Sequence, residues 1–221
     1  MLTLVKRDFF INSWLSYGGI ALILIISYLI LIPPIFMFAI IFMTLLITLF
    51  YEDDKNKVNR FLISLPVAKT QIAQSRYMFL ACLAIVLLSF QWVFMLVSKP
   101  IASIADPYYI YDWRDFTVIL CIGLLMIAIC LPIFYMIPSF LLGAGINVLL
   151  FVIGTILILT PLTTVLGMTD TIYFNELDQG FVLLAEKYIP RSPYFVLIIS
   201  SCTLYYISIK VTDWVITKRN S

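Results

Sequence analysis

Four stretches of this 221-residue chain contain no charged side chain, and they restrict its fold more than any other feature. They hold 43, 22, 54 and 18 residues, at positions 9–51, 77–98, 116–169 and 192–209. A helix rises about 1.5 Å per residue, so about 20 apolar residues cross the hydrocarbon core of a bilayer. The composition agrees, because 63% of the residues are hydrophobic and only 12% are charged. The sequence therefore predicts an all-α integral membrane protein.

Prolines divide the two longest stretches. Pro33 and Pro34 stand midway through the first, and Pro138 interrupts the third. Proline lacks an amide hydrogen and clashes with the preceding helical turn, so these positions favour hairpins between two crossings. With one helix in each short stretch, the whole chain, residues 1–221, forms one transmembrane domain of six helices. The predicted helices cover residues 14–32, 35–51, 77–97, 116–136, 139–160 and 194–215.

An even number of crossings places both termini on one side, and the distribution of Lys and Arg indicates which side. With the termini in the cytoplasm, ten basic residues lie inside and four outside, and the outer segments hold seven of the twelve acids. The inner residues are Lys6, Arg7, Lys55, Lys57, Arg60, Lys69, Arg76, Lys210, Lys218 and Arg219; the outer ones are Lys99, Arg114, Lys187 and Arg191. This pattern predicts an N-in, C-in topology and gives no reason to expect nucleic-acid binding.

Several residue types and motifs are missing, and their absence excludes classes of function. The chain has no histidine, which excludes Ser–His and Cys–His nucleophiles and histidine-dependent zinc proteases. It also has no G-x-x-x-x-G-K-[ST] loop for binding nucleotide phosphates. The four cysteines lie within predicted helices and form no C-x-x-C pair, so small buried side chains explain them better than disulfides or a metal site. We expect no enzyme activity, no metal and no cofactor in this chain. The cysteines are Cys82, Cys121, Cys130 and Cys202.

The largest predicted cytoplasmic segment between crossings is 52–76. It begins with a mixed-charge run at 52–60, which is typical of a solvated loop or a frayed helix end, and continues with the apolar residues 61–67. Pro66 suits the first turn of a helix, and from Val67 onward apolar and polar positions separate onto two sides. A short amphipathic helix here can lie on the membrane surface or dock into the groove of a partner. Spacing alone leaves both alternatives open.

The residues of this segment carry a resemblance to a known family. The pattern F-L-I-S-L-P-V-x-K-x-Q-I-x-x-x-R-Y, preceded by an acid-rich run, resembles the loop between the second and third helices of small ABC-2-type transport permeases. The length, the six predicted helices and the basic amphipathic N-terminal segment at 1–13 are similar as well. In overall texture the chain is most similar to the membrane subunits of staphylococcal exporters of phenol-soluble modulins.

The resemblance implies a bacterial plasma-membrane subunit that exports an amphipathic or hydrophobic substrate, including cytolytic or antimicrobial peptides. The energy would come from ATP bound to a separate ATP-binding-cassette subunit, and two permease subunits would pair, as a homodimer or a heterodimer. In the family, the S-L-P-V segment is a coupling helix that docks on the ATPase, and the N-terminal segment lies on the inner membrane surface. The corresponding ATPase contacts are Leu65, Pro66, Val67, Lys69, Gln71 and Ile72; Arg76 and Tyr77 begin the third helix, and Lys6 and Arg7 are the N-terminal interfacial residues.

Two further segments have more than one interpretation. The small-residue clusters Gly18-Gly19 and Gly143-Ala144-Gly145 would permit close approach of helices in a bilayer, or would mark local flexibility near a helix end. The outer segment 161–193 is longer than a simple turn, and family members place short re-entrant helices there, which cap the outer gate. Beside the permease, one alternative function remains, a non-transporting membrane scaffold or sensor whose 52–76 segment recruits a cytoplasmic partner.

Overall fold

A computed structural model describes residues 2–11, 14–29, 33–55, 68–98, 112–166 and 176–218. Within these ranges every regular element is a helix. The helices are α1 (Leu2–Ile11), α2 (Trp14–Leu29), α3 (Pro34–Lys55), α5 (Lys69–Ser98), α6 (Trp113–Met136), α7 (Phe140–Leu166), α8 (Glu176–Tyr188) and α9 (Pro193–Lys218).

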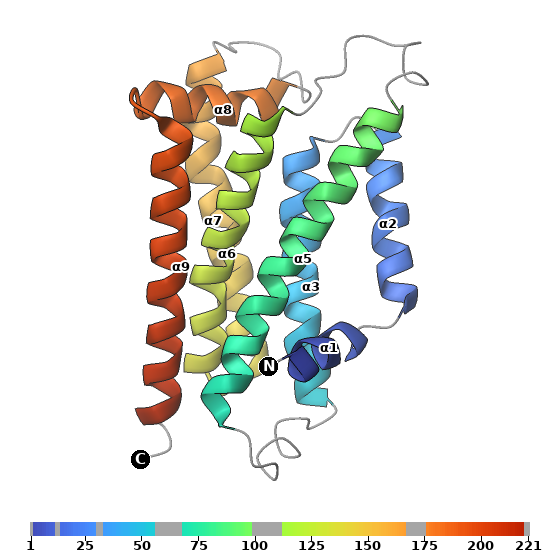
Figure 1. The fold of residues 1–221 in the computed structure, drawn as a ribbon, viewed down its shortest axis with the longest axis vertical. Coiled ribbons are helices and arrows are strands. Elements are labelled where there is room, and N and C mark those ends of the chain that lie inside the picture. Colours follow the sequence, from blue (N-terminus) through green and yellow to red (C-terminus); the bar gives the residue numbers. More distant parts are fainter. Residues whose placement is uncertain are drawn as a thin grey trace.

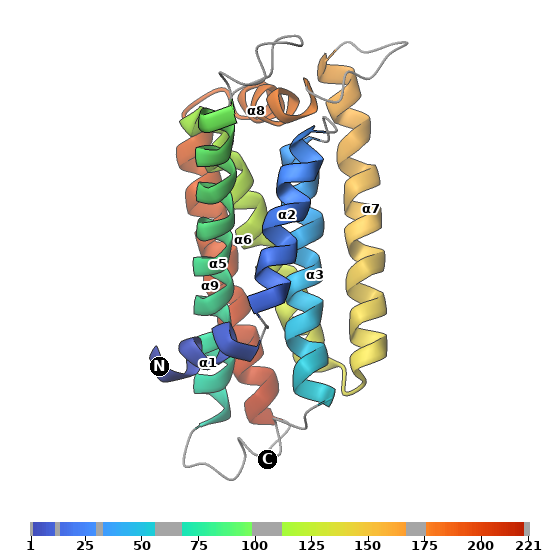
Figure 2. The ribbon, with the colours of Figure 1, turned by 90° about the vertical axis from the view of Figure 1, so that its right-hand side faces the viewer.

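Most of the helices run along the long axis of the molecule, and α1 and α8 lie across its two ends (Figure 1). Both α1 and the last residues of α9 lie at the same end, which we call the α1 end (Figures 1 and 2). The opposite end is the α8 end. Five described helices are long and apolar enough to cross a membrane, namely α3, α5, α6, α7 and α9. As described, α2 has only 16 residues, so a sixth crossing stays a prediction.

The hydrophobic core lies between α3, α5 and α6. Its largest fully buried side chains include Phe38 and Leu46 of α3, Leu80 of α5 and Ile127 of α6. A Cβ added to Gly123 of α6 would come within 3.1 Å of the Phe38 ring, so a larger residue here would force the ring to shift. In contrast, most of α7 faces outward, and Figure 2 shows it at one side of the bundle.

Local sequence explains where several helices begin and end. Pro34 and Pro193 occupy the first positions of α3 and α9, where the missing amide hydrogen costs least. Asp112 caps α6, and its own amide donates to Asp115 Oδ2 over 2.8 Å. Pro138 separates α6 from α7.

The structure differs from the predicted helix limits at the α1 end. We predicted helices over 35–51 and 77–97, but α3 continues to Lys55 and α5 begins at Lys69. Their added turns contain charged residues, and the limits drawn from the charge-free stretches excluded those turns. The cysteines also differ from their predicted uniform burial, because Cys121 and Cys130 are buried whereas Cys82 and Cys202 are exposed.

Candidate functional site

Buried polar side chains gather at the α1 end, where α1 packs against α3 and α5. Asp8 of α1 is fully buried and pairs with the neighbouring Arg7. Asp53 lies in the last turn of α3, and Arg76 and Tyr77 lie near the beginning of α5; all three side chains are almost fully buried. Burying polar groups is costly unless they are paired. The contacts of these side chains therefore show which helices are joined at the α1 end.

The guanidinium of Arg76 forms an ion pair with the Asp53 carboxylate, and each side chain is 2% exposed. The Arg76 guanidinium also lies over two aromatic rings, 4.8 Å from the centre of the Phe50 ring and 6.0 Å from that of Tyr135. Among the described residues, Asp53 Oδ1 and Arg76 Nε have no hydrogen-bond partner. The pair therefore joins α3 to α5.

Tyr77 connects α5 to α9. Its hydroxyl lies 2.6 Å from Ser208 Oγ and 2.8 Å from Thr212 Oγ1. Ser208 donates to the backbone oxygen of Ala128 in α6 over 2.7 Å. Four residues after Ala128 comes Pro132, which has no amide hydrogen to offer that oxygen, so the serine hydroxyl replaces the missing helical donor. One turn before Tyr77, Gln74 donates to Asp213 Oδ2 of α9 over 2.8 Å.

The structure describes three of the six predicted ATPase contacts. Leu65, Pro66 and Val67 lie outside the described residues. Lys69, Gln71 and Ile72 form the first turns of α5 and not a separate short helix. Gln71 is exposed, whereas Ile72 is buried within this chain. Only Gln71 of these two is thus available to a partner.

The remaining predicted residues, Arg76 and Tyr77, and Lys6 and Arg7, lie at the same end of the bundle. Lys6 is exposed and Arg7 is half-buried on α1, which crosses this end as an interfacial helix would (Figure 1). Sequence reasoning missed Asp53, because it interpreted the charged run 52–60 as solvated. A signal was present, since Leu46, Leu49, Phe50 and Asp53 share one buried helical face.

At the α8 end, two acidic residues of α8 fix this helix across the bundle. Asp178, which is buried, accepts a hydrogen bond from the backbone amide of Ile35 at the beginning of α3, over 3.1 Å. Glu186 accepts from Tyr194 of α9 over 2.7 Å and from Arg114 of α6 over 3.3 Å. These hydrogen bonds join α8 to three spanning helices, α3, α6 and α9.

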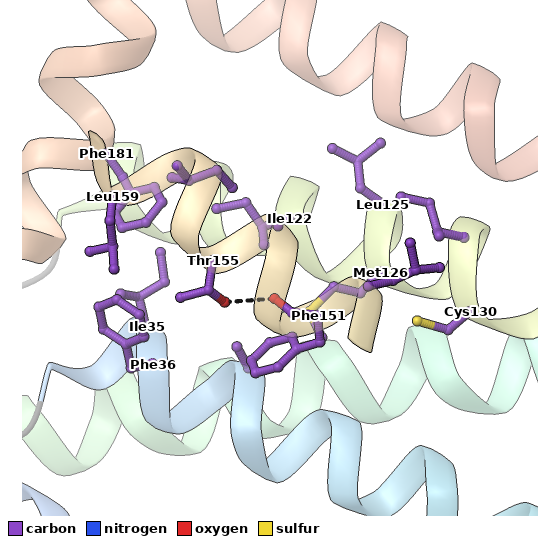
Figure 3. A pocket seen from close by; sticks show the side chains of 15 residues that line it. Ile35, Phe36, Ile122, Leu125, Met126, Cys130, Phe151, Thr155, Leu159 and Phe181 are labelled. Carbon is purple, nitrogen blue, oxygen red and sulfur yellow. Dashed lines mark hydrogen bonds between the residues drawn. The ribbon is translucent and has the colours of Figure 1, made fainter. Parts of the chain in front are cut away.

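An apolar cavity of about 330 Å³ lies between α3, α6 and α7, and Phe181 of α8 lines it at the α8 end (Figure 3). Its Thr155 hydroxyl is turned back to the Phe151 backbone oxygen, 2.8 Å away. Ile129 and Leu150 line the cavity and are also exposed at the surface. The cavity is thus suited to apolar groups that arrive from the side of the bundle.

Comparison with protein families gives a match that covers nearly the whole chain. A model described as "ABC-2 family transporter protein" matches residues 3–213. The chain belongs to this family. Its helices and its family together make it a multi-pass protein of the bacterial plasma membrane.

Membership in the family also defines what kind of component the chain is. ABC-2 permeases are the membrane-spanning components of transporters; they are not themselves catalytic and normally work with an ATPase partner. Neither the comparison with curated proteins nor that with solved structures gave a match. The substrate and the contacts with the ATPase are therefore inferred from the residues of this chain.

Proposed function

We propose that this chain is the permease subunit of an ATP-binding-cassette exporter, in which a separate subunit hydrolyses ATP to drive export. The observation that carries the proposal is the family match over residues 3–213. The chain itself would hold no cofactor, because ATP binds to the partner subunit. Docking would use the coupling segment, through Leu65, Pro66 and Val67, with Lys69 and the exposed Gln71 beside them.

The proposal includes six crossings with both termini in the cytoplasm. Support comes from the excess of inner Lys and Arg and from the position of α1 and the end of α9 at one end of the bundle (Figure 1). In this orientation the coupling segment, which follows α3, faces the cytoplasmic ATPase, and α8 faces outward over the outer gate.

Labelling of single cysteines in intact cells tests this topology. An impermeant maleimide should label a cysteine at position 179 and leave one at position 218 unlabelled until the membrane is permeabilised. Gln179 and Lys218 are both exposed, so the two positions are equally accessible within the protein. The neighbouring residue Asp178 is buried and would be a poor probe. Labelling of position 218 from outside would contradict the orientation.

We further propose that two permease subunits pair around the transport pathway, as copies of one chain or as a heterodimer. Gly18 and Gly19 of α2 and Gly145 of α7 support this, because a Cβ at each would meet nothing within 4 Å. Small residues with open space above them allow another helix to approach closely in a bilayer. Lipid would occupy such surfaces where no subunit covers them.

The substrate is proposed to be amphipathic or hydrophobic, with cytolytic or antimicrobial peptides as the favoured class. The peptide class rests on the resemblance to exporters of phenol-soluble modulins. The apolar cavity supports a hydrophobic cargo, since its volume of about 330 Å³ lies at the lower end of ligand pockets, roughly 300–1,000 Å³. It would hold an apolar part of the cargo and not a whole peptide.

A photoreactive peptide tests this use of the cavity. A synthetic amphipathic helical peptide that carries a photoreactive leucine should label Met126 and Leu150, which line the cavity. Gly154→Trp would fill the space beside Gly154 in the cavity wall and should reduce this labelling by about tenfold, the effect of losing roughly 1.4 kcal/mol of binding. The control is Leu157→Trp on the same helix, at an exposed position outside the cavity. Labelling that Gly154→Trp does not reduce would contradict the assignment.

A further inference from the structure

Arg76 and Tyr77, two buried residues near the beginning of α5, link this helix to three others. Arg76 pairs with Asp53 of α3, and Tyr77 contacts Ser208 and Thr212 of α9. Through Ser208 the contact continues to α6. All of these side chains belong to described helices, and each is at least nine-tenths buried.

The position of the ion pair in the chain is its first distinctive property. Asp53 precedes the end of α3 by two residues, and Arg76 lies seven residues after the beginning of α5. The chain between α3 and α5, residues 56–68, is the middle of the predicted coupling segment 52–76, so the ion pair joins the two helices from which this part extends. The pair therefore lies close to the points where the segment enters α3 and α5.

The chemistry of the pair is its second distinctive property. Burying two charges costs a desolvation penalty that their attraction does not always offset, and apolar residues of similar volume often stabilise a protein equally well. Asp53 Oδ1 and Arg76 Nε lack hydrogen-bond partners among the described residues, so the contacts described here do not fully offset this penalty. Stability alone therefore explains the buried ion pair poorly. A need for a directional contact between α3 and α5 explains it better.

The hydroxyl groups around Tyr77 have one consistent arrangement of protons. Ser208 has a single hydroxyl hydrogen, and it is donated to Ala128 O. The Tyr77 hydroxyl must therefore donate to Ser208, and Thr212 must donate to Tyr77. The result is a continuous chain of donors that ends on the carbonyl freed by Pro132 in α6.

We infer that Arg76 and Tyr77 are positioning residues that transmit displacement of the coupling segment to the transport helices, Arg76 to α3 and Tyr77 to α9 and α6. The inference rests on the proposed function, because it needs a partner that displaces the segment. The movement would reach the α8 end, since Glu186 of α8 bonds to Tyr194 of α9 and Arg114 of α6. A fluorescent label on α8 would therefore report, far from the ion pair, whether displacement of the coupling segment reaches the α8 end.

The test uses the full chain together with the ATP-binding subunit that co-purifies with it from native membranes. An environment-sensitive fluorophore is attached to Leu183→Cys, an exposed position of α8, after the exposed Cys82 and Cys202 are replaced by serine. The fluorescence change on adding ATP measures transmission. Recovery of the ATP-binding subunit is measured in the same preparation.

Two double variants separate transmission from folding. Asp53→Leu with Arg76→Met removes both charges at similar volume, so the chain should fold and bind the ATP-binding subunit. Its ATP-dependent fluorescence change should nevertheless fall by about tenfold, within the range of allosteric coupling energies. Exchanging the charges, Asp53→Arg with Arg76→Asp, restores a pair and should restore most of the change.

A second pair of variants tests the hydroxyl chain, the donors that run from Thr212 through Tyr77 to Ser208. Tyr77→Phe removes one hydroxyl and should reduce the fluorescence change by about three- to tenfold, as expected for one or two buried hydrogen bonds. Tyr205→Phe changes a ring that packs edge-on against Tyr77, 5.5 Å away, and should leave the change intact. A wild-type fluorescence change in the apolar Asp53/Arg76 variant and in Tyr77→Phe would overturn the inference while leaving the proposed function standing. Failure of the wild-type chain to recover any ATP-binding subunit would overturn both.

Discussion

Replacing Leu65 and Val67 by aspartate should release the ATP-binding subunit from the permease. In helix-in-groove recognition a few buried apolar anchors carry most of the binding energy. Two aspartates would place unpaired charge in that contact and cost several kcal/mol, which corresponds to at least roughly a hundredfold loss of affinity. Pull-down of the ATP-binding subunit by tagged permease measures the loss. The spanning helices should remain in the membrane, because their insertion depends on other residues.

A matched variant shows whether the effect comes from the apolar anchors. Lys69→Ala should weaken recovery far less, because a charge at the rim of an interface is worth about 1 kcal/mol or less. If the segment lay only on the membrane surface, the two aspartates would loosen its contact with lipid and leave subunit association unchanged. Equal recovery with the wild-type and doubly substituted chains, at equal membrane expression, would show that the coupling assignment is wrong.

Replacing Arg76 alone by methionine should destabilise the folded permease by about 3–5 kcal/mol, because it leaves the buried Asp53 carboxylate without its cation. The loss should appear as a lower midpoint of denaturant-induced unfolding in detergent micelles. Phe50 and Tyr135 would also lose the guanidinium that lies over their rings. The effect should therefore exceed that of an ordinary surface substitution several-fold.

Lys55→Met is the control for this prediction, since Lys55 ends α3, the helix that carries Asp53, and is exposed. Its substitution should change the free energy of unfolding by about 0.5 kcal/mol or less. Restoring neutrality by combining Arg76→Met with Asp53→Leu should recover most of the stability lost in the single variant. An unfolding midpoint for Arg76→Met equal to that of Lys55→Met would show that the ion pair does not form.

Much of the architecture could be predicted from the distribution of charge. A stretch without charged residues identifies a membrane helix because an isolated charge in hydrocarbon is expensive. The family could be predicted from the pattern around Leu65, Pro66 and Val67 together with the length of the chain, and the match over residues 3–213 confirms it. The six crossings and their orientation remain predictions.

Prediction from the distribution of charge was wrong where charged side chains are buried in pairs. Asp53 belongs to a mixed-charge run that is typical of a solvated loop, yet it is 2% exposed. Its partner is 23 residues away in sequence, in another helix, and single-sequence patterns contain no information on which distant charges meet. The beginning of α5 at Lys69 also differs from the predicted limit, because charged and polar residues end a charge-free stretch without ending the helix.

The cavity and the hydroxyl chain could not be predicted at all. Ile35, Met126, Phe151 and Phe181 belong to four helices, and only their packing decides whether a space remains between them. Likewise, Ser208 and Thr212 are ordinary helix residues in the sequence. Their role depends on Tyr77 and on the carbonyl that Pro132 leaves free, which are brought together by tertiary structure.

The central claim, that this permease is driven by a separate ATP-binding subunit, is tested most directly by the wild-type arm of the pull-down experiment. The account predicts that the tagged chain recovers a P-loop ATPase from its native membranes. It also predicts that ATP hydrolysis appears only in preparations that contain that subunit, because the permease has no loop to hold nucleotide phosphates. Recovery of no P-loop protein, or ATP hydrolysis by the permease in a preparation verified to be free of it, would contradict the account.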